Sequence, residues 1–557
     1  MAVNAPLLPN ARATYRIRTV DVSKVLCHRE RNGTILTSRK QQEEYLVRWR
    51  ALKEPPVPPR AICSWHPLKE LTLCLHHVQS YIEQLRGQSE PIADGGSITI
   101  VGAEHLSPNE LPNRKRKAPG LSAPLSNGDS GSLTPQDSAQ FSREPSLGII
   151  SSSDASGPTR QPTEVYNGFL QKREGKIIAK KSKDPNITKI VNATKLPTPE
   201  MREAASVAPV STAERFIREA FLQKLRTVPK VKLENHVDTS TPSLDFTFIR
   251  EFELRHGVQR APAEVNLGCQ KPCRPNMGQY MGCEYTKLCG CLEYAAVDEG
   301  ALESKDANGY EAYVHAKQNG YVMDTTGMPK RFPYRKSKVG EEKVPSTLQP
   351  FYLEERHPIY ECNSNCNCGP VCKSRVVQKG RKVPLVIFKT PNNRGWGVYC
   401  AEDLIRGEFI DTYLGEVITN EEADRRESKT GKDKASYLYN LDKFLGDDDT
   451  LTEDNCYVVD GQYMGGVTRF INHSCEPNCR QYTVSYNKHD LRVYDLAFFA
   501  YQDIPAGTEL TFDYMDKDEE EEEDVLRQRE EAANDPQNED KKPCNCGARK
   551  CRGYLWV

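Results

Sequence analysis

The sequence lacks any run of 18 consecutive apolar residues, so no membrane-spanning helix is expected. Its first residues, MAVNAPLLPNARAT, also lack the basic segment and apolar core of a secretion signal. We therefore expect a soluble, intracellular protein. Neither sign of charge is in excess, because 76 Lys and Arg residues balance 77 Asp and Glu residues. This balance excludes a uniformly basic nucleic-acid surface and leaves only local contacts of that kind.

Apolar residues are scarce for a chain of this length. They make up 37% of the 557 residues, and 37 residues are proline. The length predicts three or more domains, and the low apolar content predicts that linkers separate them.

The first ordered unit is predicted over residues 15–87. The segment EEYLVRWR alternates like a strand, and ICSWHPLKEL is typical of a turn and a short strand. LCLHHVQSYIEQLR has the apolar spacing of an amphipathic helix. A small α+β unit is the expected result.

Residues 88–205 are predicted to be a disordered linker, because Ser, Pro, Gly, Asn and Lys dominate there and aromatic residues are few. Within it, NRKRKAPG at residues 113–120 carries four consecutive basic residues. This run is either a nuclear-import address or ordinary solvated linker charge.

Residues 206–262 are predicted to form an ordered flanking region. In STAERFIREAFLQKLR, Ser211 and Glu214 fit a capping box at a helix start. Apolar residues then recur at four-residue spacing, at Ile217, Phe221 and Leu225. A helix is therefore predicted, and VKLENHVDTSTPSLDFTFIREFEL after it is predicted to be extended.

The C-terminal half has a different pattern. From VPLVIFKT to ELTFDY, short apolar runs are separated by Gly, Asn and Asp, which is typical of several small sheets. The acidic run DKDEEEEEDVLRQREEAANDPQNED then begins a segment at residues 516–542. A block of like charge is usually solvated and mobile.

Nineteen cysteines in a chain without a secretion signal favour metal binding, because the cytosol and nucleus keep thiols reduced. Nine of them fall within residues 263–375: Cys269, Cys273, Cys283, Cys289, Cys291, Cys362, Cys366, Cys368 and Cys372. Zinc takes four ligands, so nine thiolates suit three zinc ions if six are terminal and three each bridge two metals. The alternative is a group of reduced core cysteines.

A fourth zinc ion is predicted near the end of the chain. CNCGARKC supplies Cys544, Cys546 and Cys551, and Cys475 in RFINHSCEPN is the candidate for the fourth ligand. Because metal binding couples to folding, such a site would pin the tail beside that stretch. Free thiols are expected at the other positions: Cys27, Cys63, Cys74, Cys400, Cys456 and Cys479.

The order of the motifs carries a family resemblance. The nine cysteines are followed by RGWGVYC, YLGEVIT, YLYNLDKF, RFINHSCEPN, ELTFDY and CNCGARKCRGYLW. This order resembles the SET-domain lysine methyltransferases of the suppressor-of-variegation 3-9 type, which methylate lysine 9 of histone H3. The resemblance covers about residues 210–557, with a pre-SET zinc cluster at 263–375, a SET domain at 376–515 and a post-SET segment at 543–557.

The resemblance implies a multidomain, mainly β protein whose SET fold has several small sheets and a knot-like core. It also implies transfer of up to three methyl groups from S-adenosylmethionine to lysine 9, in heterochromatin formation and gene silencing. The histone H3 tail, the nucleosome and heterochromatin complex subunits would be partners, and the location would be nuclear chromatin. The alternatives are a non-catalytic chromatin scaffold and a methyltransferase for another lysine.

The resemblance further implies roles for single residues. The cofactor would contact Arg394, Gly395, Trp396, Tyr437, Arg469, Asn472, His473, Tyr514 and Trp556. The catalytic set would be Tyr437, His473, Phe512 and Tyr514. Phe512 and Tyr514 would line the lysine channel, and the two tyrosines would orient the amine and the methyl group. A dry channel would favour the neutral amine, because burial and a sulfonium cation both disfavour the ammonium form.

The unit at 15–87 resembles a chromodomain through VSKVL, YLVRW and SWHPLKEL. A cage for methyl-lysine needs about three aromatic side chains around the cation. Trp49 matches one position, but the others fall on Val20 and Leu52, and Tyr15 is a possible substitute. The unit is therefore either a reader of methylated histone or a fold kept for other contacts.

The acidic segment at 516–542 lies between the implied channel residues and the post-SET tail. Histone tails are basic, so it would either act as a regulatory loop that competes with or attracts substrate, or be an inert solvated insert.

Overall fold

The computed structural model describes residues 17–31, 42–50, 63–89, 169–173, 176–180, 196–261, 268–269, 273–274, 283, 289–319, 321, 323–335, 345–370, 372–430, 437–445, 451–486, 490–514, 527 and 543–555. None of the helices found there is long and apolar enough to cross a bilayer. The acidic segment at 516–542, apart from residue 527, lies outside the described residues.

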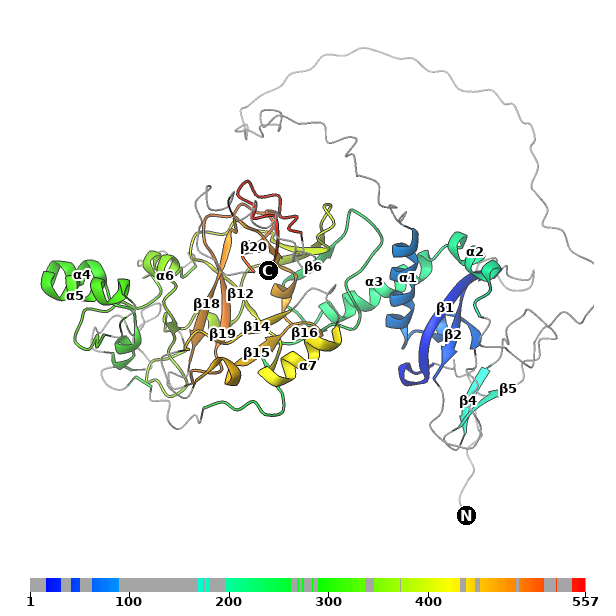
Figure 1. The fold of residues 1–557 in the computed structure, drawn as a ribbon, viewed down its shortest axis with the longest axis horizontal. Coiled ribbons are helices and arrows are strands. Elements are labelled where there is room, and N and C mark those ends of the chain that lie inside the picture. Colours follow the sequence, from blue (N-terminus) through cyan, green and yellow to red (C-terminus); the bar gives the residue numbers. More distant parts are fainter. Residues whose placement is uncertain are drawn as a thin grey trace, which may run out of the picture.

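The N-terminal unit, residues 17–89, is a three-stranded antiparallel sheet followed by a helix (Figure 1). Its strands are β1 (Val22–Arg31), β2 (Gln42–Trp49) and β3 (Cys63–Pro67), and α1 spans Leu75–Ser89. The strands and the amphipathic helix predicted here are confirmed. Apolar residues of α1, such as Val78 and Ile82, are buried and join the core formed by Val25 and Val47 of the sheet.

The range predicted as disordered linker contains regular structure at its end, so that prediction is wrong there. Strands β4 (Phe169–Arg173) and β5 (Lys176–Lys180) pair with each other, and α2 spans Pro199–Val207. Ala205 of α2 is buried in a cluster with Leu46 and Trp65 of the N-terminal sheet. The prediction used the composition of the whole range, which does not reveal a single nine-residue helix. The few apolar residues of this helix pack against residues that are far away in the sequence.

Helix α3 (Ser211–Leu225) has the predicted apolar stripe, since Ile217, Phe221 and Leu225 are all buried. The predicted capping box is wrong. Val210 is the N-cap residue and makes no side-chain cap. Instead, the carboxylate of Glu43 in β2 accepts hydrogen bonds from the amides of Thr212 (2.6 Å) and Ala213 (3.0 Å). A carboxylate there satisfies free helix amides and complements the helix dipole, so the sequence-local cap is not needed.

The segment after α3 adds one edge strand to each of three sheets in the C-terminal half. β6 (Val231–Glu234) pairs with β10, β7 (Thr247–Phe248) pairs with β16, and β8 (Glu253–Leu254) pairs with β13. All three pairings are parallel. The flanking region is therefore part of the C-terminal fold and not a separate linker.

The C-terminal half consists of several small sheets, as the sequence predicted. Its further strands are β9 (Ile359–Tyr360), β10 (Leu385–Lys389), β11 (Trp396–Cys400), β12 (Phe409–Tyr413), β13 (Glu416–Thr419), β14 (Leu438–Asn440), β15 (Tyr457–Asp460), β16 (Met464–Gly465), β17 (Asn472–His473), β18 (Cys479–Ser485), β19 (Asp495–Ala500) and β20 (Thr511–Phe512). The larger sheets have the orders β11-β10-β6, β12-β19-β18-β9 and β14-β15-β13-β8. A short parallel pair, β17 with β20, brings Asn472–His473 beside Thr511–Phe512.

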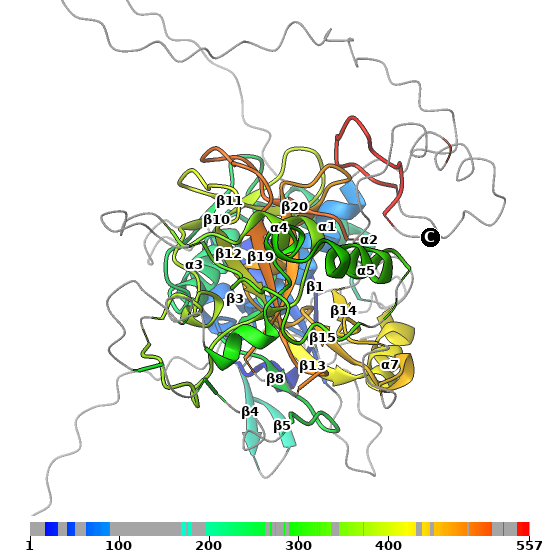
Figure 2. The same cartoon turned by 90° about the vertical axis from the view of Figure 1, so that its left-hand side faces the viewer.

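The described residues that follow β8 also form four α-helices. They are α4 (Glu299–Lys305), α5 (Ala307–Gln318), α6 (Pro350–Glu355) and α7 (Asn420–Thr430). α4 and α5 lie between the two groups of pre-SET cysteines in the sequence, and in the turned view they stand in front of the sheets (Figure 2). The aspartates that precede them cap both helices, because Asp298 accepts from the Ala301 amide and Asp306 from the Gly309 amide.

Candidate functional site

A cavity of about 670 Å³ lies where segments from across the C-terminal half meet. The loop before β11, the start of β14, the stretch 468–473 and the end of β20 all contribute to its wall. Pro242 and Ser243 of the flanking region close one side, and residues 543–546 of the tail close another. Its volume is within the usual range for pockets that hold a cofactor-sized molecule.

The loop of Arg394, Gly395 and Trp396, which was predicted to contact the cofactor, forms part of this wall. Gly395 has φ +78°, a left-handed conformation that favours glycine. Its carbonyl accepts a hydrogen bond from the Thr390 amide at 2.9 Å, which closes the turn between β10 and β11. The turn thereby places residues 393–396 at the cavity.

Glu509 is a central residue that the sequence interpretation missed. Its carboxylate forms an ion pair with Arg394 and accepts a hydrogen bond from Asn472 Nδ2 at 2.9 Å. Asn472 Nδ2 also donates to the Trp396 carbonyl at 3.2 Å. Glu509 therefore ties two segments of the cavity wall together. The available signal was its position directly before the LTFDY motif.

Arg469 lies among aromatic rings, with its guanidinium carbon 4.2 Å from the ring centroid of Tyr437 and 4.5 Å from that of Phe246. Its Nε donates to the Gly461 carbonyl at 2.9 Å. Cation–π contacts of this kind are strongest where water is excluded. Arg469 thus fixes Tyr437 at the cavity and connects it to the flanking region.

His473 contacts two other predicted site residues through its ring nitrogens. Nδ1 accepts a hydrogen bond from the Tyr514 amide at 3.1 Å, and Nε2 lies 3.3 Å from Cys475 Sγ. Burial lowers the pKa of His473, which favours the neutral ring that this arrangement requires. The ring therefore positions Tyr514 and the neighbouring thiol.

The predicted channel residues lie side by side. Phe512 and Tyr514 have ring centroids 4.8 Å apart, and Phe512 also packs edge-on against Phe498. The Tyr514 hydroxyl donates to the Ile471 carbonyl at 2.8 Å, and burial raises its pKa, so the hydroxyl stays protonated. Trp556 lies outside the described residues, and its neighbour Leu555 lines the cavity.

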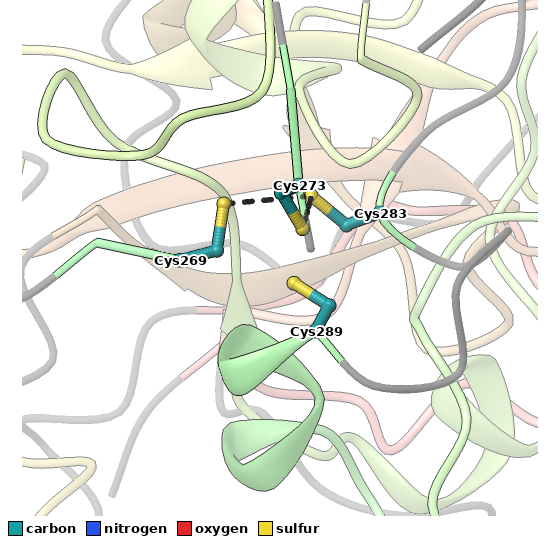
Figure 3. A group of neighbouring side chains, drawn as sticks. All are labelled: Cys269, Cys273, Cys283 and Cys289. Atoms are coloured by element: carbon teal, nitrogen blue, oxygen red, sulfur yellow. Dashed lines mark hydrogen bonds between the residues drawn. The ribbon is translucent and has the colours of Figure 1, made fainter. Parts of the chain in front are cut away.

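The pre-SET cysteines converge in one buried cluster. The sulfurs of Cys269, Cys273, Cys283 and Cys289 point toward one another in Figure 3. Three sets of four can each hold a metal ion: Cys269, Cys273, Cys283 and Cys289; Cys269, Cys362, Cys366 and Cys368; and Cys283, Cys362, Cys368 and Cys372. Sharing of thiols between sets is the bridging that the cysteine count predicted.

Cys291 lies beside the second set, with its sulfur 3.6 Å from Cys366 Sγ. If Cys291 takes the place of Cys368 in that set, Cys269, Cys283 and Cys362 each serve two metals. The six other thiols then serve one each. That arrangement agrees with three zinc ions held by nine cysteines.

The fourth set contains Cys475, Cys544, Cys546 and Cys551, whose sulfurs lie within 4.8 Å of one another. The sequence interpretation thus placed the tail beside the correct stretch. Cys27, Cys63, Cys74, Cys400, Cys456 and Cys479, which were expected to be free thiols, are buried and belong to none of the four sets.

Two further contacts hold the tail, and the sequence interpretation missed both. The Glu476 carboxylate accepts from the Arg549 amide at 2.7 Å. Arg552 Nη2 donates to Asp513 Oδ1 at 2.6 Å, and both side chains are buried. Asp513 sits between Phe512 and Tyr514, so this ion pair joins the tail directly to the channel residues.

The aromatic cage suggested for the N-terminal unit is not assembled by its described residues. Trp49 is 4% exposed, and its Nε1 donates to Ser64 Oγ at 2.9 Å, so its ring is a core residue. Val20 is 62% exposed and aliphatic. Tyr15 and Leu52 lie outside the described residues.

Comparison with known proteins agrees with the motif order. The SET domain family matches residues 395–515, and the Pre-SET motif matches residues 223–375. The chain is 39% identical over 331 residues to the H3 lysine-9 specific histone-lysine N-methyltransferase dim-5 of Neurospora crassa, covering 58% of this chain and 88% of that protein. It is 37% identical over 334 residues to the H3 lysine-9 specific KMT1 of Fusarium mangiferae, covering 59% and 89%. The solved structure of the Neurospora SET domain protein DIM-5 aligns with TM-score 0.41 and 36% identity, over 52% of this chain and 97% of that one.

These matches first define the class, a SET-domain protein with a cysteine-rich pre-SET region. The predicted fold class is thereby confirmed. The chain belongs to the family of SET-domain histone-lysine N-methyltransferases, and it is an enzyme whose methyl donor is S-adenosylmethionine.

The residues present fit both groups that this family requires. The cavity combines the polar loop at 393–396 with aromatic walls from Tyr437 and Tyr514, which suits an adenosyl group and a sulfonium centre. The cysteine sets supply only sulfur ligands in groups of four, which is the donor set of structural zinc.

Proposed function

We propose that this chain methylates lysine 9 of histone H3, up to the trimethylated state. The proposal rests on one observation: Phe512, Tyr514 and residues 543–546 of the tail line the same cavity, and the tail cysteines lie beside Cys475. The choice of lysine 9 is supported by the curated relatives, which are named for that specificity. We also propose the cysteines of the four sets, with Cys291, as the zinc ligands.

Bound S-adenosylmethionine supplies an electrophilic methyl group. The residues of the chain have to present a neutral amine, although only roughly one free lysine in a few thousand is neutral at pH 7. Phe512 is buried and Tyr514 packs against it, so the lysine side chain would enter between aromatic rings, and such desolvation disfavours the ammonium form. The rest of the rate enhancement comes mainly from alignment of the amine with the methyl group. The Tyr437 and Tyr514 hydroxyls are the polar groups that orient the amine.

A panel of H3 tail peptides, each retaining one lysine and carrying arginine at the others, tests the substrate. With labelled S-adenosylmethionine we expect transfer only to the peptide that keeps lysine 9. Transfer to a different lysine would refute the substrate assignment. Cofactor binding without transfer to any peptide would support the chromatin scaffold instead.

Phe512 is proposed to permit the third methyl transfer. A tyrosine hydroxyl at this position would occupy space beside the amine and hydrogen-bond to the amine or to a water molecule. The phenyl ring of Phe512 leaves room for dimethyl-lysine to rotate its nitrogen lone pair toward the cofactor. Phe512→Tyr should therefore shift the product to mono- and dimethyl-lysine and leave the first transfer within about threefold of wild type. Mass spectrometry of an H3 peptide under prolonged turnover measures this.

Phe351→Tyr is the matched control, because Phe351 is half-buried in α6, away from the cavity, and should still give trimethyl-lysine. A wild-type reaction that stops at monomethyl-lysine would show that channel width is set elsewhere.

The N-terminal unit is expected to bind methylated histone weakly or not at all. Trp49 is buried, and two of the aligned cage positions are aliphatic, so a cation would meet too few aromatic faces. Fluorescence titration of the full chain should give a trimethyl-lysine-9 peptide no more than about twofold advantage over the dimethyl form. Micromolar affinity for the trimethyl-lysine-9 peptide that is lost in Trp49→Ala, with the melting temperature unchanged, would show that the N-terminal unit reads methylated histone.

The acidic segment is proposed to act electrostatically on the basic substrate. Deleting residues 517–540 should change the KM for H3 peptide and flatten its dependence on salt, because charges separated by more than about 10 Å are screened at 0.1 M. An uncharged linker of equal length separates the effect of charge from that of length. Kinetics identical to wild type in both variants would mean that the segment is an inert insert.

We further propose that the enzyme works in the nucleus on chromatin. The H3 tail within nucleosomes is its substrate, and heterochromatin complex subunits are its expected partners. The basic run at 113–120, outside the described residues, is the proposed import address.

A further inference from the structure

We propose that Gln79 of the N-terminal unit is a positioning residue that holds one wall of the cofactor cavity. The inference rests on the assignment of that cavity to S-adenosylmethionine. It assigns the N-terminal unit a catalytic-support role that is independent of reading methylated histone.

Gln79 makes three hydrogen bonds to the backbone of one turn. Its Nε2 donates to the carbonyls of Thr241 (2.9 Å) and Pro242 (3.2 Å), and its Oε1 accepts from the Leu244 amide (2.8 Å). The side chain is 5% exposed, and Thr241 is equally buried. A buried amide that satisfies three backbone groups at once fixes the turn, since each group would otherwise lose its partner.

The turn that Gln79 holds is part of the cavity. Pro242 and Ser243 line it directly. A few residues further on, Phe246 stacks against the guanidinium of Arg469 at 4.5 Å, and Arg469 lies 4.2 Å from the ring of Tyr437. The position of this turn is thereby linked, through adjacent side chains, to a predicted catalytic residue.

The N-terminal unit is docked firmly enough to serve this purpose. Glu43 caps α3, and Arg86 of α1 forms an ion pair with Glu214 of α3. His28 Nε2 lies 2.9 Å from the Ala208 carbonyl, just before α3. Figure 1 shows α3 extending from the sheets of the C-terminal half to α1. The buried residues of α3 belong to the same apolar core as those of α1 and of the SET strands.

These contacts differ from those expected of a tethered reading module. A tethered module would leave Gln79 and Arg86 of α1 facing solvent, whereas Gln79 is buried and bonds to residues 241–244, and Arg86 is ion-paired with Glu214 of α3. The N-terminal unit is therefore a structural support for the turn at residues 241–244, of which Pro242 and Ser243 line the cavity.

Steady-state kinetics of full-length Gln79→Ala test the role. We expect the KM for S-adenosylmethionine and the Kd for S-adenosylhomocysteine to rise about 5- to 10-fold, since three backbone groups lose their partner. The KM for H3 peptide should stay within about twofold, because Phe512 and Tyr514 are untouched. The kcat at saturating cofactor should fall by less than the cofactor constants rise, because the turn reaches Tyr437 only through Phe246 and Arg469. Gln84→Ala is the matched control, as Gln84 is exposed on the same helix and should behave like wild type.

Gln79→Met separates hydrogen bonding from packing, because methionine fills the space without donating or accepting. It should raise both cofactor constants as Gln79→Ala does. Wild-type cofactor constants in Gln79→Met, or in a folded Gln79→Ala with a lowered melting temperature, would overturn the proposal. Calorimetric binding of S-adenosylhomocysteine gives this answer even if no histone peptide is methylated, so failure of the proposed substrate is distinguishable from failure of this inference.

Discussion

Cys475→Ser should lower methyl transfer by at least about 100-fold and remove one of about four zinc ions per chain. Cys475 is the only ligand of its set that precedes the tail, and the other three, Cys544, Cys546 and Cys551, lie within it. Its sulfur also accepts from the Arg552 amide at 3.3 Å and lies beside His473. Loss of the thiolate would therefore release the tail from the cavity and remove a contact of the ring that positions Tyr514.

Metal analysis of purified protein, together with peptide kinetics, measures both effects. Cys456→Ser is the matched control, because Cys456 is a buried thiol away from the four sets and should retain all zinc and near-normal activity. An active Cys475→Ser protein with a full zinc complement would show that the fourth set does not hold the tail. A folded, active wild-type preparation with one zinc ion or none would contradict the whole cluster assignment.

Arg552→Leu should reduce kcat/KM by at least about 100-fold without loss of zinc, because breaking a buried ion pair costs about 3–5 kcal/mol. Arg552 is 3% exposed and its guanidinium bonds to Asp513, which stands between the two channel residues. Without the guanidinium, the Asp513 carboxylate would be buried with its main counter-charge removed, and the tail would lose its ion pair with the residue between Phe512 and Tyr514.

Arg549→Leu is the control for charge on the tail. Arg549 is exposed, and its contact with Glu476 uses the backbone amide, which the substitution preserves. Adding Asp513→Asn to Arg552→Leu should recover part of the lost activity, since no unpaired carboxylate remains. Wild-type activity in Arg552→Leu would mean that zinc alone orders the tail.

Features with short sequence spacing were predicted well. The four-residue repeat of Ile217, Phe221 and Leu225 indicated α3 because a helix buries one stripe whatever it packs against. The cysteine spacing and the order of the SET motifs indicated the metal clusters and the cavity residues. Cys475 was paired with the tail by counting ligands, because zinc requires four.

Features that depend on distant partners were missed or wrong. The prediction of a capping box was wrong because Glu43 caps the helix in place of the local pair. Glu43 lies 169 and 170 residues away in the sequence from the two amides that it caps. Glu509 was overlooked because its partners Asn472 and Arg394 lie 37 and 115 residues away in the sequence. Gln79 was overlooked because its partners lie at least 162 residues away. Trp49 was aligned with a cage by its motif, but Ser64 in the adjacent strand holds it in the core.

A structure of the full chain bound to S-adenosylhomocysteine and an H3 tail peptide tests the central claim most directly. We predict that the cofactor product occupies the cavity against residues 393–396 and Asn472–His473. Lysine 9 should reach it through a channel bordered by Phe512 and Tyr514, under a tail held by zinc at Cys475. A cofactor product bound outside this cavity, or a different lysine in the channel, would contradict the account.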